Sequence, residues 1–229
     1  MHCIVTAGPT AEPLDQVRRL TNSSTGRLGS ELANFLSERG HEVTLLIGRQ
    51  ATWRGERRAR LIQTFTTTAD LRQRLGALAK LPIDAVFHAA AVSDFAFGRT
   101  WRRAPTGELS EIGAGKISSR LGVLLAELVP TPKIIAELRG WFHQARLVGW
   151  KYEVDGDRSG VMRLAEKQIA QCLTDACVAN GPAYGAGFGL ARREGQPLHL
   201  ADARALFQAL EQVMGGVSRK MSKPSRWSG

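Results

Sequence analysis

The regular alternation of short apolar runs with helical segments constrains the fold of this chain more than any other feature. Apolar runs of strand length occur at residues 3–7, 41–48, 61–65, 83–92, 146–150 and 176–180. Segments with apolar side chains at helical spacing occur at residues 26–40, 66–81, 131–142, 163–173 and 201–214. Because strands and helices follow one another in turn, the sequence predicts a mainly parallel sheet covered by helices on both faces.

This pattern predicts one Rossmann-like, three-layer α/β domain over residues 1–214. The chain has 229 residues, which fits one large domain better than two. Two runs at 187–192 and 196–200 resemble a late strand pair. Residues 215–229 are predicted to form a basic, flexible tail, because Gly, Ser, Pro, Lys and Arg cannot build a core.

One long segment, residues 93–120, shows no clear periodicity. A connection of this length without regular structure predicts a functional loop or flap. The run at 122–129 that follows fits a strand, although its period is ambiguous.

Composition limits the function classes. The net charge is +10, which suits an enzyme with anionic substrates; the sequence shows no nucleic-acid-binding motif, so nucleic acid is not an expected partner. No apolar run has the length of a membrane helix and the start lacks a secretory signal, so we expect a cytoplasmic protein without membrane association. The three cysteines, Cys3, Cys172 and Cys177, are expected to be core residues rather than a disulfide framework or a metal site.

Two loops are candidates for binding, because ligands of such sheets lie at the carboxyl ends of the strands. They follow the runs at 3–7 and 83–92. Just before the first helix, a stretch of hydroxyl and amide side chains leads to a glycine, in the order Asn22, Ser23, Ser24, Thr25 and Gly26. Such a stretch either binds an anion at the helix amino terminus or serves only to cap the helix, and the pattern leaves both open.

The second loop, residues 88–95, carries three alanines and then an acidic residue, Asp94. A carboxylate beside phosphates favours a bound Mg²⁺, whereas the simpler interpretation is that Asp94 caps a turn. A single lysine, Lys116, lies in the glycine-rich stretch 113–120 and could close over a polyphosphate, although most surface lysines have no such role.

Two common nucleotide motifs are missing. The G-x-G-x-x-G fingerprint does not follow the first strand, and no acidic residue ends the second strand, which argues against a dinucleotide site. The P-loop pattern is also absent.

Together these segments resemble the phosphopantothenoylcysteine synthetase family (phosphopantothenate–cysteine ligase). Residues 5–29, VTAGPTAEPLDQVRRLTNSSTGRLG, are similar to that family's opening run, TAGGT-x-E-P-(I/L)-D-x-V-R-x-(I/L)-(S/T)-N-x-S-S/T-G-x-(M/L)-G. Further segments, HAAAVSDF, GKISS, TPKII, LVGWKYE and ACVAN, resemble the family's AAVADY, KIKK, NPDI, VGFAAET and (I/V)-x-AN in family order.

The resemblance implies a ligase that joins 4′-phosphopantothenate to cysteine in coenzyme A biosynthesis. CTP or ATP is consumed with Mg²⁺, an acyl-nucleotidylate forms, and pyrophosphate is released; no flavin is expected. Members pair as homodimers through the sheet edge and the flap, so a flap and dimerisation extension is implied. Asn22 then supports the acyl intermediate and Lys116 contacts the nucleotide phosphates. The remaining implied contacts with nucleotide or substrate are Gly8, Thr10, Ser23, Ser24, Thr25, Gly26, Ala90, Ala91, Asp94 and Phe95, with Asp94 also the Mg²⁺ contact.

The chain also departs from the family pattern. Two flap lysines are replaced by Ser118 and Ser119, the aspartate of NPDI by Lys133, and the alanine pair of FAAET by Lys151 and Tyr152. The flavin-binding decarboxylase half of many bacterial members is not present, which implies a stand-alone synthetase domain. A divergent nucleotide-binding or regulatory paralogue without ligase activity is the alternative, and an NAD(P)-dependent reductase is a weaker one.

Overall fold

A central eight-stranded sheet organises the protein. The computed structural model describes residues 1–113 and 115–215, apart from the side chain of Ser119. The strands of the sheet are β1 (His2–Ala7), β4 (Glu42–Gly48), β5 (Leu61–Phe65), β6 (Ala85–His88), β10 (Arg146–Tyr152), β11 (Ala176–Asn180), β12 (Phe188–Arg192) and β13 (Leu198–Leu200). Their order is β13-β12-β11-β10-β6-β1-β4-β5, and all pairs are parallel except those made by β12 and β13. The predicted Rossmann-like α/β fold is confirmed.

Helices cover both faces of this sheet. The helices are α1 (Arg27–Glu38), α2 (Thr68–Leu78), α3 (Ile134–Trp141), α4 (Arg158–Cys172) and α5 (Ala203–Gly215). Buried side chains of α1 and α5, such as Leu32 and Leu210, share one apolar cluster with Val5 of β1. Side chains of α2 and α3, such as Leu71 and Leu138, share a second cluster on the other face. Each fully buried side chain of this size contributes about 1.5–3 kcal/mol, so the two clusters fix the three layers.

Two helix starts differ from the sequence-based prediction. The second helix begins at Thr68 rather than at residue 66, because the side chain of Thr67 caps it by accepting a hydrogen bond from the main-chain N–H of Asp70 at 3.1 Å. The fourth helix begins at Arg158 rather than at residue 163, because Asp157 accepts from the N–H of Gly160 at 2.7 Å and so caps the chain earlier. Capping side chains set both boundaries.

The polar loop between β1 and α1 contains a small hairpin that the sequence did not predict. Its strands are β2 (Ala11–Pro13) and β3 (Arg19–Thr21), which pair antiparallel. Three-residue strands are too short to leave an alternating pattern in the sequence.

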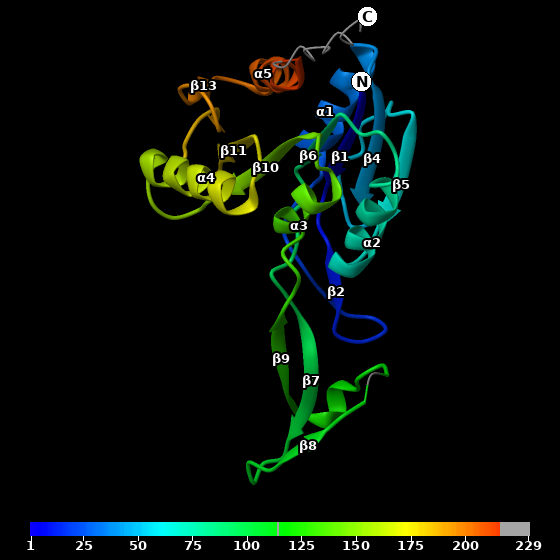
Figure 1. Cartoon of the computed structure of the whole chain (residues 1–229). Coiled ribbons are helices and arrows are strands. Elements are labelled where there is room, and N and C mark those ends of the chain that lie inside the picture. The colour runs from blue at the N-terminus through cyan, green and yellow to red at the C-terminus, as the bar shows by residue number, and fades with distance from the viewer. Residues whose placement is uncertain (114, 216–229) are drawn as a thin grey trace, which may run out of the picture.

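The segment predicted as a flap is largely regular. It forms β7 (Phe95–Arg103), β8 (Leu109–Glu111) and a 3₁₀ turn at Ser119–Leu121, and the strand expected at 122–129 is β9 (Val123–Pro130). These strands pair with one another, in the order β8-β7-β9, and not with the central sheet. Figure 1 shows this arm (residues 95–130) projecting away from the body. Because most residues of β7 and β8 face solvent, they carry no periodic apolar pattern, and the sequence did not show these two strands.

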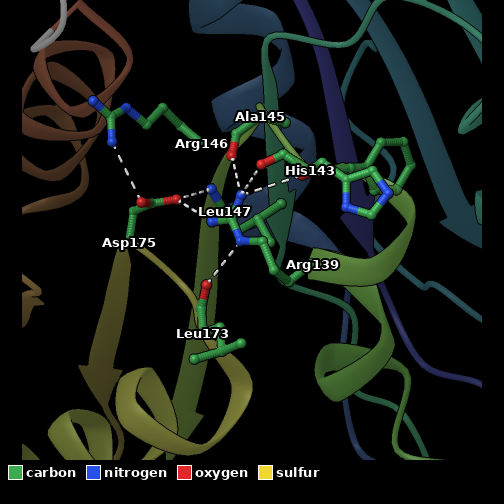
Figure 2. A network of polar contacts seen from close by, with 8 residues as sticks. Arg139, His143, Ala145, Arg146, Leu147, Leu173 and Asp175 are labelled. Atoms are coloured by element: carbon green, nitrogen blue, oxygen red, sulfur yellow. Dashed lines mark hydrogen bonds and ion pairs between the residues drawn. The ribbon is translucent and has the colours of Figure 1, made fainter.

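A guanidinium network closes the end of the sheet remote from the arm (Figure 2). Arg139 of α3 donates to the carboxylate of Asp175 at 2.7 Å and to main-chain oxygens at the ends of α3 and α4. Asp175 also accepts from the N–H of Leu147 at 2.8 Å and from Arg146 at 3.3 Å. The network therefore fastens both helices to the start of β10.

The cysteines and the chain end complete the description. All three cysteines are free and buried, as expected for core residues, and burial raises the pKa of Cys3 and of Cys177 to about 12. No helix within the described ranges is long and apolar enough to cross a membrane. The final helix reaches Gly215, and the rest of the predicted basic tail, residues 216–229, lies outside the described residues.

Candidate active site at the switch point of the sheet

The two candidate loops meet where the order of the strands reverses. β1 lies between β4 and β6, so the chain leaves β1 on one side and returns on the other. In sheets of this kind ligands bind in a crevice at the carboxyl ends of the strands at this point. Pro9 and Ala91 form an isolated parallel bridge there. The N–H of Ala91 donates to the Gly8 oxygen at 3.0 Å, and the N–H of Thr10 donates to the Ala91 oxygen at 3.2 Å. The two predicted loops are thus one surface.

Asn22 lies beside the line of contact between the loops after β1 and β6, which is called the seam below. It follows β3 directly, and its side-chain amide donates to the main-chain oxygens of Val92 at 3.2 Å and Ala91 at 3.4 Å. The Thr21 hydroxyl donates to the Thr10 oxygen at 2.8 Å, which holds the end of β3 against the first loop. An exposed amide is therefore held at a fixed place over the crevice.

The glycine at the start of α1 is tightly packed. Gly26 is the N-cap with φ 74°, in the left-handed region, and Gly8 has φ 76°. A Cβ at Gly26 would lie 2.9 Å from Ile47 Cδ1 and 3.3 Å from Gly8 Cα, so no larger residue fits without strain. Gly26 has no side chain to cap the first turn of α1, but the N–H of Arg27 donates to the Thr25 hydroxyl at 3.2 Å. Capping by the stretch before the helix thus satisfies one main-chain N–H of α1, that of Arg27.

The predicted ligand contacts Thr10, Ser23, Ser24 and Thr25 divide into two groups. Ser23 and Thr25 are exposed beside Asn22, and Ser24 is half-buried, with its N–H donating to the Asn22 oxygen at 2.9 Å. Thr10 is fully buried, and its hydroxyl accepts from the N–H of Ser93 at 2.9 Å. Thr10 therefore positions the second loop, and its predicted contact with a ligand stays a prediction.

A cavity of about 420 Å³ adjoins the second loop on the side of β10 and α3. It is lined by His88, Ala90, Val92, Ser93, Asp94, Phe95, Pro130, Thr131, Pro132, Lys133, Ile134, Ile135, Trp150, Lys151 and Gln168. This volume is typical of a small-molecule site. Three of the predicted residues, Ala90, Asp94 and Phe95, thus share one cavity, whereas Gly8 and Gly26 lie on the α1 side of the seam.

A buried histidine that the sequence analysis did not single out lies in the wall of this cavity. His88 is 6% exposed, and its Nδ1 lies 3.0 Å from the Thr6 hydroxyl. Burial lowers the pKa of His88 to about 4, because the charged imidazolium loses its solvation. The ring is neutral near pH 7 and adds no charge to the cavity.

The residues present fit a magnesium ion that is bound mainly through the ligand. Across the described ranges no group of three or more His, Cys, Asp or Glu side chains forms a metal site. Asp94 is exposed and supplies the carboxylate of the cavity wall. Mg²⁺ commonly takes one or two carboxylates and completes its shell with substrate phosphates and water. Asp94 suits that role.

Lys116 lies beside a latch that connects the arm to the tip of the β2–β3 hairpin. Asp15 accepts from the N–H of Ile117 at 3.2 Å, and Arg18 donates to the Ile117 oxygen and pairs with Asp15 at 2.9 Å. Hydrogen bonds from the N–H groups of Arg18, Val17 and Ile117, together with the Arg18 charge, lower the pKa of Asp15 to about 2.

The structure places exposed Lys116 at the hairpin tip, while Asn22 follows the base of β3. A three-residue strand spans about 10 Å, so Lys116 and Asn22 lie near opposite ends of the hairpin, and their shared contact with one nucleotide stays a prediction. The sequence analysis missed the latch, although the D-x-x-R spacing of Asp15 and Arg18 is visible in the motif.

Comparison with known proteins identifies the family of the chain. The family model for the DNA/pantothenate metabolism flavoprotein C-terminal domain matches residues 1–210. The coenzyme A biosynthesis bifunctional protein CoaBC of Thermococcus kodakarensis is 34% identical over 177 residues, covering 77% of this chain and 40% of that protein. CoaBC of Bacillus subtilis is 31% identical over 189 residues, covering 82% and 42%. The chain thus spans about two fifths of the length of these relatives.

A solved structure shares the whole fold. The DNA/pantothenate metabolism flavoprotein from Streptococcus pneumoniae superposes with a TM-score of 0.79 at 26% identity and covers 95% of this chain and 100% of that one. The resemblance found in the sequence is therefore confirmed: this chain belongs to the DNA/pantothenate metabolism flavoprotein C-terminal domain family and is a phosphopantothenoylcysteine synthetase-like domain.

Proposed function

We propose that this chain is a phosphopantothenate–cysteine ligase of coenzyme A biosynthesis. The observation that carries the proposal is the amide of Asn22, held 3.2 Å from the Val92 oxygen over a crevice at the switch point of the sheet. Relatives that span the same domain are named as coenzyme A biosynthesis proteins, and the order of motifs in residues 5–29 agrees with that activity. A cytoplasmic location, expected from the sequence, belongs to the same proposal.

The proposed reaction has two steps. The carboxylate of 4′-phosphopantothenate attacks the α-phosphorus of CTP or ATP, the bond to the β-phosphate bridge breaks, and pyrophosphate leaves. The cysteine amine, after losing a proton, then attacks the acyl carbon, and the nucleoside monophosphate leaves with the electron pair of the broken acyl–oxygen bond. Both steps bring anions together or develop negative charge, so hydrogen-bond donors and cations at the crevice are what the chain must supply.

The residues at the crevice suit these tasks. Asn22 is a donor that needs no proton transfer, so it can stabilise the acyl-nucleotidylate by hydrogen bonding alone. The exposed hydroxyls of Ser23 and Thr25, with the start of α1, would hold a phosphate group. Asp94 would hold Mg²⁺, which supplies charge neutralisation of the nucleotide phosphates when bound. Lys116 is exposed and would contact the nucleotide phosphates.

A homodimer is part of this proposal, with a second copy of this chain on the arm. The arm exposes large apolar side chains, Phe95, Leu109, Val123, Leu125, Leu128 and Val129, with exposed fractions of 38–52%. An apolar surface of this kind on a projecting hairpin is typical of a protein interface. Sedimentation of the wild type as a monomer at micromolar concentration would refute the dimer.

The test of the ligase is a reconstitution. The purified protein is mixed with 4′-phosphopantothenate, L-cysteine, Mg²⁺ and either CTP or ATP, and pyrophosphate and the coupled product are measured. We expect pyrophosphate release with one of the nucleotides, dependent on phosphopantothenate. Reactions that lack cysteine or phosphopantothenate are the controls. Absence of release with both nucleotides would refute the ligase, and nucleotide binding without turnover would instead support the non-catalytic alternative.

A further inference from the structure

Two residues that depart from the family pattern, Lys133 and Lys151, line the same cavity. Lys133 replaces an aspartate of the pattern and Lys151 replaces an alanine. Lys133 is the N-cap residue of α3, and Lys151 lies near the end of β10, so the sequence alone does not relate them. In the structure both line the cavity that holds Asp94. Both differences from the family pattern therefore place a lysine at the same cavity.

The ammonium groups of Lys133 and Lys151 both influence the same buried side chain, Cys172. Burial raises the pKa of the Cys172 thiol, and the charges of Lys133 and Lys151 both oppose that rise, so both lie near this side chain. Across the described ranges Lys133 makes no ion pair. Lys151 lies 3.4 Å from Glu153, and both of these side chains are 30% exposed. A pair that is this long and this accessible to water is weak, so a ligand anion can compete for Lys151.

The rest of the cavity wall determines which anion fits. The charged residues that line the cavity are Asp94, Lys133 and Lys151, and His88 is neutral near pH 7, so the lining carries more positive than negative charge. Apolar side chains, Phe95 and Ile134 among them, line the same space and suit the flat face of a nucleobase. A volume of about 420 Å³ is more than a single phosphate group needs. A nucleoside triphosphate has both the flat apolar part and the high negative charge that this wall matches.

We propose that Lys133 and Lys151 bind the polyphosphate of the nucleoside triphosphate in this cavity. The proposal rests on the ligase function and names two specificity-determining residues for it that the family pattern does not contain. Ammonium groups beside a triphosphate attract it without replacing any acid or base, so they affect nucleotide affinity more than the chemical step.

The test uses the full chain and two double variants with equal charge change. Lys133→Gln with Lys151→Gln removes both ammonium groups of the cavity. Lys80→Gln with Lys167→Gln is the matched control, because those two lysines are exposed and do not line the cavity. Lys133→Arg with Lys151→Arg keeps the charge. Circular dichroism confirms that each variant is folded, and calorimetry measures binding of CTP, ATP and inorganic tripolyphosphate.

We expect the cavity variant to bind its nucleotide and tripolyphosphate about tenfold more weakly, with an equal rise in nucleotide KM and kcat changed less than about twofold. The control and the arginine variant should bind like the wild type. Equal binding by the cavity variant, or wild-type protein that binds neither nucleotide nor tripolyphosphate, would overturn the proposal. A rise in the KM for phosphopantothenate instead of nucleotide would overturn it as well.

The two proposals fail separately. A wild type that releases no pyrophosphate refutes the ligase, while calorimetry with tripolyphosphate still tests the lysines. A wild type that turns over with unchanged kinetics in the cavity variant refutes the lysine assignment alone.

Discussion

The side-chain amide of Asn22 lies 3.2 Å from the main-chain oxygen of Val92, a residue 70 positions later in the chain. This contact joins the end of the β2–β3 hairpin to the loop that leads from β6 into the arm. Because the same loop is bridged to the end of β1 at Pro9 and Ala91, three segments are held in register at the crevice. Geometry fixed in this way is what a donor to a developing charge requires.

Replacement of Asn22 by aspartate should lower turnover by about 10²-fold or more, because the carboxylate has no donor and faces two carbonyl oxygens. Nucleotide binding should remain measurable by calorimetry. Asn34→Asp is a suitable control: the Asn34 amide also donates to a main-chain oxygen, that of Glu56 at 2.7 Å, away from the crevice. Near-normal pyrophosphate release by the Asn22 variant would contradict the role of Asn22.

Replacement of Asp15 by asparagine should release the latch between the hairpin tip and Ile117. The expected result is amide exchange at Ile117 that is faster by about tenfold or more, with little change in global unfolding. Hydrogen exchange with mass spectrometry measures this, and Asp155→Asn on a surface turn is the control. Unaltered exchange around Ile117 would show that the latch does not hold the arm.

The pH dependence of this latch follows from the lowered pKa of Asp15. A carboxyl whose pKa falls from 3.8 to about 2 on folding stabilises the folded state at every pH above the unfolded value. That stabilisation is lost as the pH falls from 3.8 through about 2, so protection of Ile117 in the wild type should persist down to about pH 4. Loss of amide protection at Ile117 between pH 7 and pH 5 would contradict the lowered pKa of Asp15.

His88 should make the protein less stable in mild acid. Its pKa is lowered from 6.5 to about 4 on folding, so the unfolded chain binds more protons between these values and stability falls as the pH falls. Between pH 7 and pH 5 the loss due to this group is about 2 kcal/mol. Urea unfolding at both pH values should show a smaller loss in His88→Gln than in the wild type. Identical pH dependence in the two proteins would refute the assignment.

Replacement of Arg139 by glutamine should destabilise the fold by about 2–3 kcal/mol, because Asp175 and several main-chain oxygens lose a donor in a half-buried network. The matched control is Arg72→Gln, since Arg72 pairs with Glu137 at 2.8 Å but is 50% exposed, and its loss should cost less than about 1 kcal/mol. Thermal unfolding with chemical denaturation compares the two. Equal costs would show that the network in Figure 2 contributes no more than a surface pair.

Local chain chemistry was enough for the sheet and for most of its helices. Apolar runs such as residues 41–48 predicted buried parallel strands, and the helical spacing within residues 26–40 predicted α1, because these preferences act within a few residues. The same reasoning failed for β2, β3, β7 and β8. Those strands are short or face solvent, so they leave no alternating apolar pattern.

The sequence by itself determined the Rossmann-like class, the family, and the choice of the loops after residues 3–7 and 83–92 as candidates for binding, because parallel strands bring their carboxyl ends to one edge. Only the tertiary structure decided that Asn22 lies over Val92, that Ile117 is fastened to Asp15, and that Lys133 and Lys151 share a cavity. These contacts join residues far apart in the chain, and their distances follow from how helices and hairpins pack on the sheet, which no local pattern encodes.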